Sequence, residues 1–215
     1  MASHPRRSAR IGTAALLAIG FVVVAGWVMI AGSFPGDRRA LVEIHEIVGT
    51  STDEPMIAIG DATDGLPLIG VAVVLAAVLL WAGRPKDALF LLLGLGVAIA
   101  LNPVFKELVG RSRPDLWASP ESTSRYSFPS GHAAGTAALV GGLVMMVRTE
   151  RRRLALAVGA VFLAVVGFSR LAVGVHYPSD LVAGWLWVGA WTTLLWSTQV
   201  SRCAGGHLAD HGAAS

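Results

Sequence analysis

Six long runs of apolar residues constrain this chain more than any other feature of its sequence. A helix needs about 20 mostly apolar residues to cross the hydrocarbon core of a bilayer. The runs have about that length, and charges, prolines or polar clusters separate them at 11–32, 65–83, 88–105, 131–147, 154–173 and 181–200. The sequence therefore predicts an all-α polytopic membrane protein with six transmembrane helices in a bundle.

The composition excludes a water-soluble globule and a disordered chain. Hydrophobic residues make up 54% of the sequence and charged residues only 14%, whereas a soluble domain has about 25% charged residues. A chain with so little charge cannot cover a surface that faces water, and it has too many aliphatic residues for a disordered protein. The one cysteine, Cys203, excludes an internal disulfide framework and a cysteine-based metal cluster.

The apolar runs also divide the chain into segments. The first run has 22 residues, which is longer than the apolar region of a cleaved signal peptide, so we expect it to be retained as the first span. The six-span domain then covers 11–200, between a basic tail at 1–10 and a disordered tail at 201–215. These segments leave no room for a separate soluble domain.

The distribution of Lys and Arg predicts the orientation in the membrane. Ten of the 17 basic residues lie in the N-terminal tail, after the second run, in an Arg-rich turn after the fourth run and in the C-terminal tail. We expect this side to be cytoplasmic, with both termini on it. The net charge of +3 reflects this topology, and no basic patch with interleaved aromatic residues predicts a nucleic-acid partner.

The first extracytoplasmic loop, at 33–64, carries seven carboxylates. Within it Leu41, Ile44 and Val48 recur at helical spacing after Asp37. This pattern predicts a short interfacial helix with Asp37 as its N-cap.

Strongly polar residues gather in the two later loops that this topology places outside the cell, and they include Lys106, Arg111, Arg113, Ser130, His132, Arg170, His176 and Asp180. Each has an ordinary structural explanation when it is taken alone. Lys106, Arg111 and Arg113 would be interfacial anchors, and Ser130 would be a helix N-cap. These explanations do not account for the placement of the whole set on one side of the membrane. Ionisable residues at membrane depth are energetically costly, and they are usually functional or paired.

A phosphoryl-transfer site explains the set. Lys106, Arg113 and Arg170 supply three cations that can hold a phosphate by charge-assisted hydrogen bonds. Ser130 and Gly131 open the fourth run, where backbone N–H groups at the start of a helix bind anions. Gly131 also lets the backbone approach the anion closely, because it has no Cβ.

The remaining residues of the set supply the chemistry. Two histidines, His132 and His176, offer a general acid and a nucleophile, and Asp180 can orient one of them. The cations stabilise the charge on the phosphoryl oxygens, which is the task that magnesium has in other phosphoryl-transfer sites. We therefore expect no metal and no cofactor.

Three segments of this set resemble a family signature. They read Lys106-x6-Arg113-Pro114, Pro129-Ser130-Gly131-His132 and Ser169-Arg170-x5-His176-x3-Asp180. The pattern resembles the three-part signature of the type-2 phosphatidic acid phosphatases, also called lipid phosphate phosphatases, at all eleven fixed positions. The signature spans 106–180, and the six-span layout extends the resemblance over most of the chain.

The resemblance implies a role for each residue. His176 would take the phosphoryl group and form a phosphohistidine, and Asp180 would fix the tautomer of its imidazole. His132 would protonate the leaving oxygen and then activate water for hydrolysis. The phosphate would be bound by Lys106, Arg113, Ser130, Gly131 and Arg170.

The function implied is a metal-independent membrane phosphatase whose partners are the bilayer and a lipid phosphate on the extracytoplasmic face. Candidate substrates are polyprenyl diphosphate, phosphatidic acid and phosphatidylglycerophosphate, and the short first loop favours the polyprenyl carrier. Two alternatives stay open: a phosphotransferase that uses the same intermediate, and a non-catalytic protein that binds lipid phosphates. The sequence predicts no particular oligomeric state.

Overall fold

The structure, a computed structural model, describes residues 4–49, 52–117, 124–147 and 149–209. The described residues form helices and contain no strand, and an isolated antiparallel bridge joins Ser112 to Tyr126. The helices are α1 (His4–Ala31), α2 (Asp37–Val48), α3 (Asp53–Ala62), α4 (Gly65–Trp81), α5 (Pro85–Val109), α6 (Gly131–Met146), the 3₁₀ turn η2 (Thr149–Arg151), α7 (Arg152–Ala172) and α8 (Pro178–Ala209). The predicted all-α class is confirmed.

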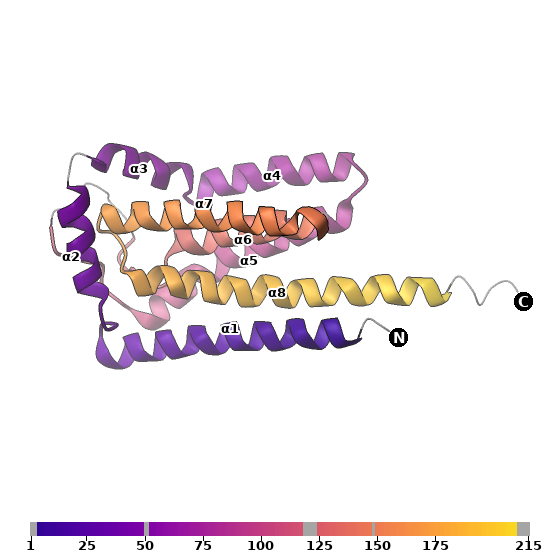
Figure 1. Ribbon diagram of the computed structural model, residues 1–215, viewed down its shortest axis with the longest axis horizontal. Helices are drawn as coiled ribbons and strands as arrows, with labels where there is room; N and C mark the ends of the chain where they lie inside the picture. Colours follow the sequence, from indigo (N-terminus) through magenta and orange to yellow (C-terminus); the bar gives the residue numbers. More distant parts are fainter. Residues whose placement is uncertain (1–3, 50–51, 118–123, 148, 210–215) are drawn as a thin grey trace, which may run out of the picture.

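Helices α1, α4, α5, α6, α7 and α8 lie lengthwise in a bundle, and α2 crosses one end of it (Figure 1). Helix α1 packs along α8, and α6 packs against α5, α7 and α8. Helix α3 lies beside the end of α7 that is near α2. The start of α1 and the end of α8 lie at the opposite end of the bundle, together with the connections α4–α5 and α6–α7.

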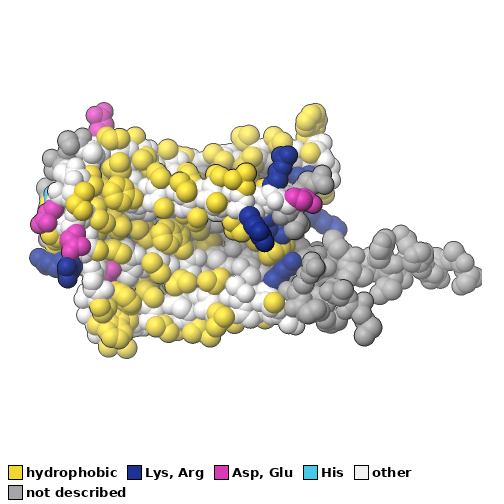
Figure 2. Space-filling model, viewed as in Figure 1, with side chains coloured by type: hydrophobic (Ala, Val, Ile, Leu, Met, Phe, Trp, Pro, Cys, Tyr) yellow, Lys and Arg dark blue, Asp and Glu magenta, His cyan; other side chains and the backbone are white. Residues whose placement is uncertain are grey.

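The surface of the bundle is that of a membrane-embedded protein. Figure 2 shows apolar side chains along its length and charged side chains gathered at its two ends. Within the described residues, three helices, α1, α5 and α7, are long and apolar enough to cross a bilayer by themselves, and the pair α3–α4, bent by 46°, counts as a fourth when it is taken as one span. Helix α6 has 16 residues and so measures about 24 Å, which is less than the hydrocarbon core of about 30 Å. Six spans therefore remain a prediction.

A glycine contact holds α8 against the start of α6. A Cβ on Gly184 would lie 2.9 Å from the carbonyl oxygen of Ser130 and 2.9 Å from Cβ of Ala133. The backbone N–H of Ser130 also donates a hydrogen bond to the carbonyl of Asp180, at 3.0 Å. The first turns of α6 and α8, which carry much of the predicted site, are thus fixed relative to each other.

The structure corrects the prediction for Asp37. The predicted short helix is present as α2, but its N-cap is Gly36, with φ of 86°, and Asp37 is its first residue. The Asp37 carboxylate is buried and forms an ion pair with Arg111. It is therefore not available to cap its own helix.

The two ends of the chain are more helical than the sequence indicates. Helix α1 begins at His4, within the predicted basic tail. Helix α8 continues to Ala209, past residue 200, where the sequence predicts the start of a disordered tail. Residues 210–215 lie outside the described residues.

Candidate active site

A cavity of about 540 Å³ opens at the end of the bundle near α2 and α3. Five of the eight predicted site residues line it: Lys106, Arg113, Gly131, His132 and His176. The other three, Ser130, Arg170 and Asp180, are fully buried. The structure thus brings residues from α5, α6 and the segment before α8 to one place, although the sequence separates Lys106 from His176 by 70 positions.

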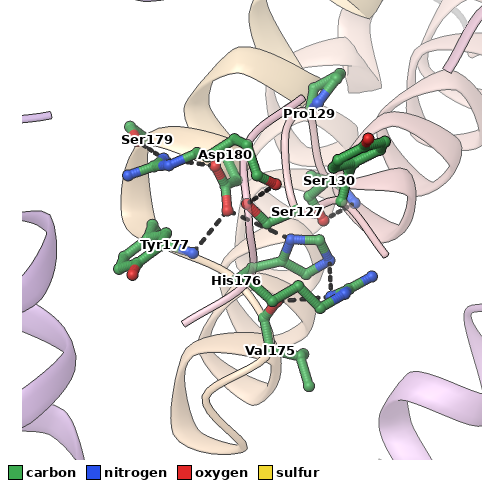
Figure 3. A network of polar contacts seen from close by, with 12 residues as sticks. Ser127, Pro129, Ser130, Val175, His176, Tyr177, Ser179 and Asp180 are labelled. Carbon is green, nitrogen blue, oxygen red and sulfur yellow. Dashed lines mark hydrogen bonds and ion pairs between the residues drawn. The ribbon is translucent and has the colours of Figure 1, made fainter. Parts of the chain in front are cut away.

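His176 and Asp180 form the buried half of the site (Figure 3). His176 lies in the segment between α7 and α8, and Asp180 lies in the first turn of α8. Nδ1 of His176 is 3.5 Å from Oδ2 of Asp180, and the two side chains are 2% and 0% exposed. A carboxylate on this side favours the tautomer with the proton on Nδ1, which leaves a lone pair on Nε2.

The surroundings keep His176 neutral at physiological pH. Burial, together with the charges of Arg113 and Lys106, lowers its pKa from 6.5 to about 4, although the hydrogen bond and the charge of Asp180 oppose this decrease. Nε2 lies 3.5 Å from Nη1 of Arg113. A neutral imidazole beside a guanidinium that can bind an anion is what nucleophilic attack on a phosphate requires.

Asp180 is held by partners that the sequence did not identify. Its Oδ1 accepts a hydrogen bond from Nη1 of Arg111, at 2.6 Å, and its Oδ2 accepts one from the backbone N–H of Tyr177, at 2.8 Å. The same Arg111 donates to Oδ2 of Asp37, at 2.6 Å, and to Oγ of Ser179, at 2.7 Å.

A buried chain of charges, Asp37–Arg111–Asp180, therefore links α2 to the pair His176 and Asp180. Taken alone, the sequence around each residue predicts an interfacial anchor at Arg111 and a helix cap at Asp37. No local spacing could connect them, because 74 residues separate Asp37 from Arg111 and 69 separate Arg111 from Asp180.

Lys106 and Arg113 hold the segment that leads into α6. Nζ of Lys106 donates to Oγ of Ser124, at 2.7 Å, and to the carbonyl of Tyr126, at 2.9 Å. Arg113 donates from Nε to the carbonyl of Ser124 and from Nη1 to the carbonyl of Val175, both at 2.6 Å. Both cations line the cavity as well, so they can bind an anion there and shape its wall.

Ser130 is the N-cap of α6, as its structural explanation predicted. Its hydroxyl oxygen accepts a hydrogen bond from the backbone N–H of Ala133, at 3.4 Å. Gly131, the next residue, lines the cavity, and a Cβ there would lie 3.3 Å from Nδ2 of Asn102. Phosphate binding by Ser130 itself stays a prediction.

His132 faces His176 across the cavity. The two rings are T-shaped, with centroids 6.3 Å apart. Both rings also line the cavity. Nε2 of His132 lies 3.9 Å from Oδ1 of Asp64, a residue at the bend between α3 and α4.

Arg170 is not among the residues that line the cavity. It is fully buried, and it donates from Nε to Oγ of Ser169, at 3.2 Å, and from Nη2 to the carbonyl of Met56 in α3. Its guanidinium packs directly against Gly60, since a Cβ at that position would lie 2.0 Å from Nη1 of Arg170. Arg170 thus joins α7 to α3, and no sequence pattern indicates the role of Gly60.

No group of three or more His, Cys, Asp or Glu side chains within the described ranges has the arrangement of a metal site. The expected absence of a metal or cofactor stays a prediction, because this geometry does not test it.

Comparisons with known proteins agree with this geometry. Residues 87–203 match the sequence profile of the PAP2 superfamily. An undecaprenyl-diphosphatase from Sulfolobus acidocaldarius is 32% identical over 132 residues, which are 59% of this chain and 61% of that protein. Phosphatidylglycerophosphatase B from Bacillus subtilis is 31% identical over 125 residues, or 55% of this chain and 60% of that protein. The aligned regions thus span about three fifths of these relatives.

The fold also has a solved counterpart. The crystal structure of a transmembrane PAP2-type phosphatidylglycerolphosphate phosphatase from Bacillus subtilis superposes with a TM-score of 0.72. The match covers 90% of this chain and 96% of that one, at 23% sequence identity. At this level of identity the match establishes the fold alone.

Proposed function

Because this chain belongs to the PAP2 superfamily, we propose that it is a membrane phosphatase that hydrolyses lipid phosphate or diphosphate monoesters without a metal. One observation carries the proposal: His176, paired with the buried Asp180, faces His132 across a cavity that Lys106 and Arg113 line. Nucleophile, orienting carboxylate, acid and anion-binding cations are thus together.

The first step forms a phosphohistidine. Lys106, Arg113 and the start of α6 bind the phosphate. Nε2 of His176 attacks the phosphorus, and the bond from phosphorus to the bridging oxygen breaks. His132 gives its proton to that oxygen, a general-acid contribution of roughly 10²–10⁴-fold.

The second step releases inorganic phosphate. His132, now neutral, takes a proton from water, and the water oxygen attacks the phosphorus of the phosphohistidine. The bond from phosphorus to Nε2 breaks, and His176 returns to its neutral state beside Asp180. Asp180 stabilises the positive charge on the imidazole during both steps.

The proposal includes a topology of six spans with both termini in the cytoplasm. The Arg-rich connection between α6 and α7 lies at the end of the bundle opposite to the cavity (Figure 1), and basic connections favour the cytoplasmic side. The cavity then faces outward, where a lipid of the outer leaflet can present its phosphate.

Phosphate release by the purified protein in detergent and EDTA tests this function. The substrates are polyprenyl diphosphate, phosphatidic acid, phosphatidylglycerophosphate and a soluble sugar phosphate. We expect release from at least one lipid, none with His176→Ala, and an acid-labile phosphoryl group on the wild-type protein. Activity that EDTA removes and magnesium restores would refute the metal-independent mechanism, and full activity of His176→Ala would refute the assigned nucleophile.

A further inference from the structure

The cavity contains carboxylates that the proposed mechanism does not use. Besides its cations and histidines, it is lined by Asp61, Asp64 and Glu107. Carboxylates repel a phosphate, so their presence in a site for anions calls for an explanation.

Of these three carboxylates, Asp64 has the most specific position, because it lies near His132. It is the N-cap of α4, yet its side chain makes no capping hydrogen bond. An N-cap aspartate ordinarily accepts a bond from a backbone N–H of the first turn. The Asp64 carboxylate instead has its Oδ1 3.9 Å from Nε2 of His132.

The positions of the two histidines indicate that Asp64 lies beside the leaving group. In-line displacement places the nucleophile and the leaving oxygen on opposite sides of the phosphorus. If His176 attacks from one side of the cavity, the leaving oxygen is on the side of His132. Asp64 therefore borders the leaving group, whereas Lys106 and Arg113 border the phosphate that is transferred.

A carboxylate at this place treats two kinds of leaving group differently. An alcohol is a very weak acid, so its oxygen must receive a proton as the bond breaks. The carboxylate of Asp64, with Oδ1 3.9 Å from Nε2 of His132, can stabilise the positive charge of the protonated imidazole that gives this proton.

The other kind of leaving group is a phosphate, which departs when a diphosphate is cleaved. It is already an anion, with a pKa of about 6, and it needs no proton from His132. The charge of Asp64 also repels it. Both effects of Asp64 thus act in the same direction.

We propose that Asp64 makes this enzyme selective for lipid phosphate monoesters of alcohols over lipid diphosphates. The inference rests on the proposed function and narrows its substrate class. With phosphatidic acid, Nε2 of His176 bonds to phosphorus, the bridging oxygen takes the proton of His132, and diacylglycerol leaves. With a diphosphate, the bridging oxygen leaves unprotonated as part of a lipid monophosphate.

The test compares kcat/KM for dioctanoyl phosphatidic acid and for farnesyl diphosphate in wild type and Asp64→Asn. The side chain of Asp64 is 71% exposed, so we expect an effect typical of exposed charge pairs: about three-fold lower on phosphatidic acid and about three-fold higher on the diphosphate, which changes the ratio about ten-fold. Glu54→Gln is the matched control, because it removes the same charge from an exposed position of α3 outside the lining of the cavity.

Each outcome decides between the two proposals. A ratio that Asp64→Asn leaves unchanged, a wild type that prefers the diphosphate, or an equal shift in Glu54→Gln would overturn the role of Asp64 while phosphatase activity stands. Release from neither substrate by the wild type would overturn the proposed function and this inference with it.

Discussion

The two histidines of the site lie in contrasting surroundings. His176 is 1% exposed, and its carboxylate partner Asp180 is bound to Arg111, which in turn binds Asp37. His132 is 13% exposed at its side chain, and the carboxylate near it, Asp64, is 71% exposed. A nucleophile must keep one orientation and one protonation state, whereas an acid must exchange protons with water. The burial of each histidine suits its proposed task.

The largest expected effect comes from removing the negative charge of Asp180, the buried partner of His176. Asp180→Asn leaves a side chain of the same shape, but it no longer favours the tautomer with a free Nε2 on His176. We expect kcat to fall by roughly 10⁴-fold, the loss known for the equivalent change in a serine protease triad. Steady-state phosphate release measures it. A loss of less than ten-fold would mean that Asp180 does not orient the nucleophile.

Breaking the Asp37–Arg111–Asp180 chain of charges at Asp37 is expected to lower the stability of the fold. Asp37→Asn removes one of the two carboxylates that Arg111 binds, and we expect the free energy of unfolding to fall by about 3–5 kcal/mol, as for other broken buried pairs. Thermal unfolding in detergent checks this. Glu43→Gln, which breaks the exposed pair with Arg39 on the same helix, should change stability by less than about 1 kcal/mol. Equal effects of the two variants would contradict the structural role of Asp37.

The next largest effect is expected at the contact between α8 and α6, which holds the start of α6, with His132, against the start of α8, with Asp180. Gly184→Ala inserts a Cβ 2.9 Å from the Ser130 carbonyl, and we expect a cost of about 1–3 kcal/mol with reduced kcat, because the two helix starts move apart. Gly189→Ala is the control on the same helix, since its Cβ would lie 3.4 Å from Cδ1 of Leu17. If both variants behave alike in thermal unfolding and activity, close approach at Gly184 is not what positions the site.

The smallest expected effect is the response of the free enzyme to mild acid. Burial lowers the pKa of His176 to about 4, so its imidazole stays neutral from pH 7 down to that value. Its contribution to kcat/KM should be constant between pH 7 and 5 and be lost as pH falls through about 4. A pH profile of kcat/KM for a substrate whose own ionisation is known measures this. An acid limb near pH 6.5 that belongs to His176 would contradict its burial.

The sequence predicted the helical class of the fold and supplied candidate site residues, but it did not indicate the contacts that support them. Helices and membrane embedding follow from apolar runs, which act locally. The residues of the signature could be identified because their types and spacings are characteristic, and the structure places five of them around one cavity. Asp37, Gly60 and Asp64 belong to no such pattern, because their partners Arg111, Arg170 and His132 come from distant parts of the chain. Only the packing of the helices brings these pairs together.

The order of the charged chain along the sequence has a consequence for biogenesis. Asp37 is synthesised first, Arg111 follows, His176 comes in the segment just before α8, and Asp180 comes in the first turn of α8. A ribosome that has completed α1 to α7 has therefore made the acid and the cations of the site but neither member of the nucleophilic pair. Under the proposed mechanism the site is complete only when the start of α8 has been made, so a translation product that stops before α8 should be unable to dephosphorylate lipids.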